Sequence, residues 1–251
     1  MWGVIAALGC LLVVFYFVLR QEGRASLNIT TGRRASTSES NLQMTSVDES
    51  ELVNPVLIID TETTGLIIDN SIRVTTKNLE QYSDNFPRIV QVAYILLDSN
   101  GNNYSYSTYV KQNQPIPARA INVHGITNEM CEKEGETLSD VLNELSDKVS
   151  QCDTIVGYNV NFDFKVLQAE FLRSKMGFPF HQFNKVDAMR SAQKILDLKL
   201  SHKISLANAS KQILGDLNVY ESSIDLDKRH DALSDATTTA IIYLLEKSLD
   251  Y

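Results

Sequence analysis

The chain has 251 residues, of which 43% are hydrophobic and 22% are charged, and its formal net charge is −8 at pH 7. This length suits one sizeable domain with an appendage, and the composition is that of an ordinary globular protein. The negative charge argues against a broad basic surface for gripping duplex nucleic acid, but it allows a short engagement at an acidic site that holds cations. The three cysteines have no CxxC spacing and are odd in number, so they indicate neither a disulfide framework nor a zinc site.

The first segment in chain order is apolar. Residues 2–19 (WGVIAALGCLLVVFYFVL) carry no charged side chain, which is close to the length of about 17–25 residues that a membrane-spanning helix needs. Arginines follow this run rather than precede it, which favours an uncleaved single-pass anchor with its C-terminal side in the cytoplasm. A cleaved signal peptide is the alternative, although it prefers basic residues before the apolar run and a small-residue cleavage site. We therefore predict a transmembrane anchor at 1–20, a flexible linker at 21–53 and a folded domain at 54–251.

The folded part begins with three predicted strands. Residues 56–60 (VLIID), 88–98 (RIVQVAYILLD) and 104–111 (YSYSTYVK) read as strands, with a turn at 99–102 (SNGN) between the second and the third. The polar stretch 69–85 interrupts the first hairpin and is predicted as a loop. It is a tolerated surface insertion, or it lengthens the strands, forms a lid or binds a partner.

Strands and helices alternate in the rest of the chain. Helical spacing predicts a helix at 138–149 with Thr137 as its N-cap. A buried strand at 154–159 (TIVGYN) then precedes a helix at 162–175, the segment KVDAMR enters a strand-to-helix unit with Asp187 as a cap, and two helices follow at 205–214 and 232–249. This order predicts an α/β domain with a mixed sheet flanked by helices.

Acidic residues occur where the hydrophobic pattern alone does not explain them. Asp60 ends an apolar strand and Glu62 lies two residues further on, so alternation puts both acids on the same strand face, where an unpaired buried charge is costly. Asp163 lies at the start of one predicted helix and Asp235 lies in another, with His230 just before that helix. Carboxylates on three separate elements, with one histidine, form the set that a two-metal phosphoryl-transfer site requires. Histidine suits the role of general base toward a water molecule.

The segments DTETTG, GYNVNFD and HDALSD, in this order, resemble the three motifs of the DnaQ-like 3′→5′ exonucleases. The position of His230 resembles the DEDDh branch of that family, and the segment PIPARAINVHGIT (115–127) is similar to one that proofreading subunits carry. The resemblance covers about residues 56–249. It implies a ribonuclease H-like fold and a nuclease that depends on two Mg²⁺ or Mn²⁺ ions.

The resemblance also implies roles by position. Asp60, Glu62 and Asp235 would hold one metal ion, Asp60 would bridge to the second ion, Asp163 would complete that ion's shell, and His230 would be the general base. The residues expected to contact or support the substrate are Thr63, Gly65, Leu66, His124 in its loop, and Asn159. Tyr158 departs from the pattern, because many relatives have histidine at this position, and the change puts a substrate contact in doubt.

The expected substrate is the 3′ end of single-stranded or frayed DNA, with RNA as the open alternative, and the products are nucleoside 5′-monophosphates. Three other interpretations compete with a membrane-anchored exonuclease. They are a catalytically silent module that binds nucleic acid or a protein partner at a membrane, a secreted or periplasmic nuclease, and a polymerase-bound proofreading subunit.

Overall fold

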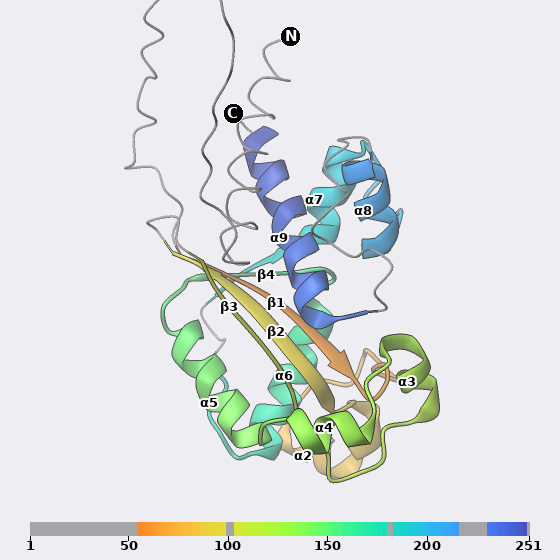
Figure 1. Cartoon of the computed structure of the whole chain (residues 1–251), viewed down its shortest axis with the longest axis vertical. Helices are drawn as coiled ribbons and strands as arrows, with labels where there is room; N and C mark the ends of the chain where they lie inside the picture. Colours follow the sequence, from red (N-terminus) through yellow and green to blue (C-terminus); the bar gives the residue numbers. More distant parts are fainter. Residues whose placement is uncertain (1–54, 99–102, 180–182, 216–229, 250–251) are drawn as a thin grey trace, which may run out of the picture.

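The computed structural model describes residues 55–98, 103–179, 183–215 and 230–249 (Figure 1). The strands are β1 Val56–Thr63, β2 Ile89–Leu97, β3 Asn103–Tyr109, β4 Thr154–Gly157 and β5 Asn184–Asp187. The helices are α2 Thr76–Gln81, the 3₁₀ helix η2 Ser83–Asn85, α3 Ala118–His124, α4 Asn128–Glu134, α5 Leu138–Val149, α6 Asn161–Arg173, α7 Ala188–Ile195, α8 Leu206–Gly215 and α9 Ala232–Leu249.

The five strands form one mixed sheet in the order β3-β2-β1-β4-β5. The β1–β2 and β2–β3 pairs are antiparallel, whereas β4 and β5 continue the sheet in parallel with β1. An antiparallel meander can be joined by tight turns, but the parallel strands need crossover helices, here α6 between β4 and β5. The predicted mixed sheet is confirmed, and β1 lies at its centre.

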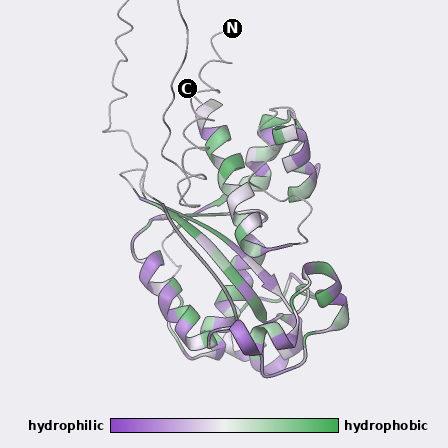
Figure 2. Cartoon of the chain, in the orientation of Figure 1, coloured by the Kyte–Doolittle hydropathy of each residue, from purple (hydrophilic) through white to green (hydrophobic). Residues whose placement is uncertain are grey.

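The central strand is apolar on both faces because helices cover both faces of the sheet. Leu57 and Ile59 pack in one hydrophobic cluster with residues of α5 and α6, while Val56 and Ile58 pack in another with residues of α9. Figure 2 shows apolar residues along the central strands and hydrophilic residues at the arrowhead of β1. The strand therefore carries its polar residues where it leaves the core.

Helix ends follow local capping chemistry. The Thr137 hydroxyl accepts a hydrogen bond from the Asp140 amide, and the Asp187 carboxylate accepts one from the Met189 amide, so both predicted caps are confirmed. The buried residues of α5, which are Val141, Leu142, Leu145 and Val149, recur at helical spacing along one face.

Four short helices, α2, η2, α3 and α4, are absent from the sequence-based prediction. The predicted loop at 69–85 was wrong, because it contains α2 and η2, with the Thr75 side chain capping α2 and Leu79 as its buried residue. The loop expected around His124 was also wrong, because this residue ends helix α3, and Gly125 adopts the left-handed conformation (φ 78°) that ends helices. Helices of six or seven residues are too short to show an apolar period, so only their caps could have indicated them.

The predicted anchor at 1–20 and the linker at 21–53 lie outside the described residues. Among the residues that are described, no helix is both long and apolar enough to cross a membrane.

Candidate active site

The two acids of β1 point to the side of the sheet that α9 covers. Asp60 and Glu62 both lie within β1, which continues to Thr63, three residues beyond the end of the predicted strand. Because side chains alternate along a strand, both acids share the face of Val56 and Ile58, which pack against α9. The expectation that one strand presents both carboxylates on the same face is confirmed.

The intervening residue joins β1 to α6. The Thr61 backbone amide and hydroxyl both donate hydrogen bonds to Asp163 Oδ1, at 3.0 and 2.7 Å. Asp163 is 3% exposed and lies in the first turn of α6, where the helix dipole favours a negative charge. The third acidic position is therefore fixed directly beside the first two.

Helix α9 and the residues just before it supply the last two members of the set, Asp235 and His230. Helix α9 packs against β1 and β2, and His230 Nδ1 lies 3.5 Å from Asp235 Oδ2. The potential ligand atoms of Glu62, His230 and Asp235 all lie within 4.8 Å of one another. The structure thus brings together the five residues that the motifs singled out, from β1, α6 and the start of α9.

Crowding and burial make these carboxyl groups harder to ionise. Burial, followed by the nearby Asp163, Asp235 and Glu62, raises the pKa of Asp60 well above its usual range. Burial raises the pKa of Glu62 to about 7, against the opposing effect of His230. Burial also raises the pKa of Asp163 to about 7, although the hydrogen bonds from Thr61 oppose the shift.

A cation would relieve this repulsion. Among the ion pairs of the described residues, none joins a lysine or arginine to Asp60, Glu62, Asp163 or Asp235. Four carboxylates that have no lysine or arginine partner in the described part of the chain form an oxygen-rich set of the kind that Mg²⁺ and Mn²⁺ prefer. The residues present therefore fit a divalent metal centre.

The turn after β4 is held by hydrogen bonds between side chains and the backbone. Asn159 adopts a left-handed conformation (φ 61°), and its amide donates a hydrogen bond of 2.8 Å to Asp187 Oδ1, the same atom that caps α7. The hydroxyl of Tyr158 donates to the Ile204 carbonyl at 2.8 Å, and its ring packs against two hydrophobic clusters. Tyr158 therefore ties this turn to the segment before α8.

The residues expected to contact the substrate near β1 lie at the C-terminal end of this strand, which is called the exit of β1 below. The Thr63 hydroxyl donates to the Gly65 carbonyl at 2.6 Å, and Leu66 is 77% exposed. Gly65 lies against the Arg119 guanidinium, since a Cβ on this glycine would be 3.6 Å from Nη2. His124 is buried, its Nδ1 accepts a hydrogen bond from the Ile126 amide, and burial lowers its pKa against the effect of the nearby Thr63 backbone.

Three side chains that contribute to this site were not predicted from the sequence: Thr61, Gln91 and Arg119. Thr61 stood between the two acids and was therefore visible in the motif. Gln91 lies on β2, outside every motif, and Arg119 lies on α3, within the segment 115–127 but without an expected role; only the folded chain brings both to the site.

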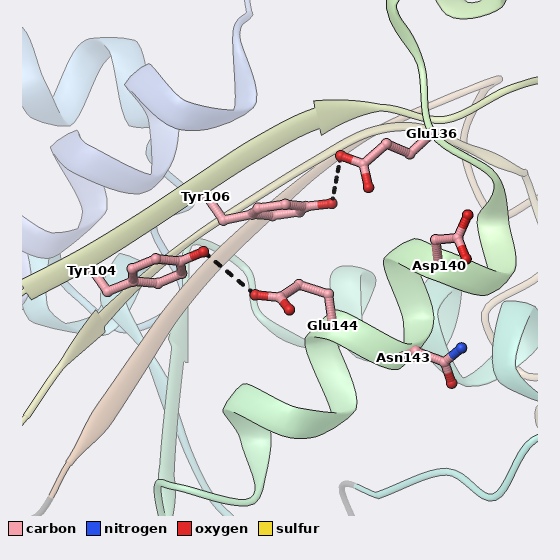
Figure 3. A pocket seen from close by; sticks show the side chains of 6 residues that line it. All are labelled: Tyr104, Tyr106, Glu136, Asp140, Asn143 and Glu144. Atoms are coloured by element: carbon pink, nitrogen blue, oxygen red, sulfur yellow. Dashed lines mark hydrogen bonds between the residues drawn. The ribbon is translucent and has the colours of Figure 1, made fainter.

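A groove of about 540 Å³ lies elsewhere, between the edge strand β3 and helix α5 (Figure 3). It is lined by Tyr104, Tyr106, Glu136, Asp140, Asn143 and Glu144. The Tyr106 hydroxyl donates to Glu136 at 3.0 Å and the Tyr104 hydroxyl lies 3.5 Å from Glu144. Dashed lines in Figure 3 mark both hydrogen bonds. None of the five motif residues lines this groove, so it is not part of the candidate site.

The chain is similar in sequence to known exonucleases. An exonuclease family model, RNase_T, matches residues 57–243. The 3′-5′ exonuclease DinG of Bacillus subtilis is 26% identical over 199 residues, which cover 76% of this chain and 18% of that protein. The DNA polymerase III subunit epsilon of Haemophilus influenzae is 26% identical over 199 residues, which cover 77% of this chain and 68% of that protein.

Solved structures share the fold. The zinc-bound form of an Escherichia coli exonuclease I complex with single-stranded DNA superposes with a TM-score of 0.57 at 21% identity, covering 78% of this chain and 41% of that one. The expected ribonuclease H-like exonuclease fold is thereby confirmed. This chain spans less than two thirds of the length of the first curated relatives that it matches.

Proposed function

Because this chain belongs to the RNase_T exonuclease family and carries a DnaQ-like 3′→5′ exonuclease domain, we propose that it removes nucleotides from the 3′ ends of DNA in a metal-dependent reaction. One observation supports this proposal above the others. Four carboxylates and one histidine converge from three separate elements at one end of the sheet, without a lysine or arginine partner among the described residues. A silent binding module would have no reason to keep so costly an arrangement.

The carboxylates would divide between two divalent ions. Asp60, Glu62 and Asp235 would hold the first ion, and Asp60 together with Asp163 would hold the second. When bound, Mg²⁺ or Mn²⁺ would polarise the scissile phosphate and lower the pKa of the attacking water. The raised pKa values of these acids are the electrostatic cost of the arrangement without a cation.

His230 is suited to act on the water. Its side chain is 58% exposed, so substrate and solvent can reach it, and the adjacent Asp235 raises its pKa. His230 would accept a proton from water as the water oxygen bonds to phosphorus. The bond from phosphorus to the 3′ oxygen of the preceding nucleotide then breaks, and that oxygen takes a proton from solvent.

The exit of β1 would receive the terminal nucleotide. Leu66, Ile68 and Val123 are large, exposed apolar residues on the segments that follow β1 and form α3, and Arg119 lies beside Gly65. Apolar side chains can pack against a base, and an arginine can bind a phosphate. Since the terminal nucleotide must be unpaired to reach the acids, we expect a preference for single-stranded or frayed ends.

Location is also part of the proposal. The uncharged segment 2–19 and the arginines that follow it support a single-pass anchor with the domain in the cytoplasm. The enzyme would then degrade 3′ ends close to a membrane.

The test uses the full chain, purified in mild detergent, with 5′-labelled and 3′-labelled single-stranded DNA and RNA. Each substrate is incubated with Mg²⁺, with Mn²⁺ and with chelator, beside Asp60→Ala and a control, Asp147→Ala, at an exposed position on α5. We expect a ladder that shortens from the 3′ end and disappears with chelator and with Asp60→Ala, but not with Asp147→Ala. Intact substrate in every lane from a folded protein would contradict the proposal and favour the binding module.

A further inference from the structure

Gln91 is a buried polar residue that none of the sequence motifs includes. It lies on β2 directly opposite Glu62 in the β1–β2 register, and it is 4% exposed. Directly opposite residues of an antiparallel pair point to the same face. Gln91 therefore shares with Glu62 the face of the sheet on which α9 begins.

The amide of Gln91 bonds to the first residues of α9. Its Nε2 donates to Asp231 Oδ2 at 3.1 Å and to Ser107 Oγ at 3.3 Å, while its Oε1 accepts from the Ala232 amide at 3.2 Å. The other oxygen of the same carboxylate, Asp231 Oδ1, accepts from the Ser234 amide at 3.1 Å. Helix starts leave several backbone N–H groups without intrahelical partners, and here Gln91 and Asp231 satisfy two of them.

The hydrogen bonds that join Gln91 and Asp231 to the first residues of α9 form a junction, and this junction sets the position of two active-site residues. His230 directly precedes Asp231, and the Asp235 amide donates to the Asp231 carbonyl at 2.9 Å. A shift at the start of α9 would therefore move His230 and Asp235 relative to Glu62. Strand β2, which carries Gln91, is held in place because it pairs with β1 on one side and with β3 on the other. Gln91 can therefore fix the position of the start of α9 relative to the sheet.

The junction works in one orientation of the amide only. Oε1 must face the Ala232 N–H and Nε2 must face the Asp231 carboxylate, since two donors or two acceptors facing each other would repel. A glutamate at this position would place a carboxylate against that of Asp231. An apolar residue would leave a buried N–H without an acceptor.

We propose that Gln91 is a positioning residue that holds the start of α9, and hence His230, in register with the acids of β1. This inference rests on the proposed exonuclease function for its catalytic consequence. Gln91 acts on the reaction through His230, so it should influence the turnover number more than substrate binding.

The test exchanges donor and acceptor across the junction. Gln91→Glu and Asp231→Asn each create a repulsive contact. The double variant restores both hydrogen bonds, because the carboxylate introduced on β2 can accept from the Ala232 amide and from the side-chain amide introduced at the start of α9. We expect each single variant to lower kcat about 10- to 100-fold with KM within about twofold, as small misplacements of a reacting group do. The double variant should return to within about threefold of the native kcat. Gln81→Glu, at an exposed position on α2, controls for the added charge.

Hydrogen exchange provides a readout that does not depend on activity. The amides of Ala232 and Ser234 should exchange faster in both single variants and slowly again in the double variant. Single variants with native kcat, or a double variant as slow as the single ones, would overturn the inference. If the native protein had no nuclease activity but amide exchange in the variants still followed this pattern, the proposed function would be refuted. The role of Gln91 in holding the start of α9 would then stand.

Discussion

Glu62→Gln should stabilise the protein when metal is absent, although it removes a residue of the candidate centre. Burial is the main cause that raises the Glu62 pKa from 4.5 to about 7, so ionising this carboxyl group at neutral pH works against folding. Because the folded-state pKa lies above the unfolded one, the folded protein binds more protons between these values, and its stability falls as the pH rises through them. The full cost is reached above pH 7.

The size of the effect follows from the shift. A difference of about 2.5 pKa units corresponds to about 3 kcal/mol in the free energy of unfolding. For a domain of this size, this is a rise of roughly 6–12 °C in the melting temperature. Glutamine is close to glutamate in shape, so it removes the charge with little change in packing.

Thermal and urea unfolding with chelator at pH 4 and pH 8 would measure this difference. We expect the variant to match the native protein at pH 4 and to be more stable at pH 8, while Glu132→Gln, at an exposed position on α4, changes neither value. Added Mn²⁺ should stabilise the native protein and reduce the gap, since a ligand bound only to the folded state stabilises it. A variant that is no more stable than the native protein at pH 8 would refute the argument that buried, unpaired charge strains this site.

Three further predictions concern other residues. His230→Ala should lower kcat by about 10²- to 10⁴-fold while Mn²⁺ still raises the melting temperature, as steady-state assays and calorimetry would show. Thr61→Val removes one of two hydrogen bonds to Asp163, so the Mn²⁺ concentration for half-maximal activity should rise several-fold; an unchanged metal titration would contradict the role given to this hydroxyl. Glu170→Ala removes a buried carboxylate that pairs with two arginines and should lower the free energy of unfolding by about 3 kcal/mol in urea titrations, with kcat retained in the folded protein.

The order of the motifs and most of the larger elements could be predicted from the sequence. A run such as VLIID favours a strand, and two acids spaced by one residue share a face of that strand. The later helices show an apolar period over several turns, which is why their bounds differ from the prediction by only a few residues. The short helices α2, α3 and α4 could not be found in this way, because their few residues contact the core at one or two points.

The contacts that hold the site together were decided by the tertiary structure. Thr61 and Asp163 are 102 positions apart in the chain, and Gln91 and Asp231 are 140 apart. The sequence determined which chemical groups the protein has and on which elements they lie. Only the packing of α6 and α9 against the sheet decided that these groups meet, because hydrogen bonds between distant segments depend on the position of whole elements and leave no periodic pattern in the chain.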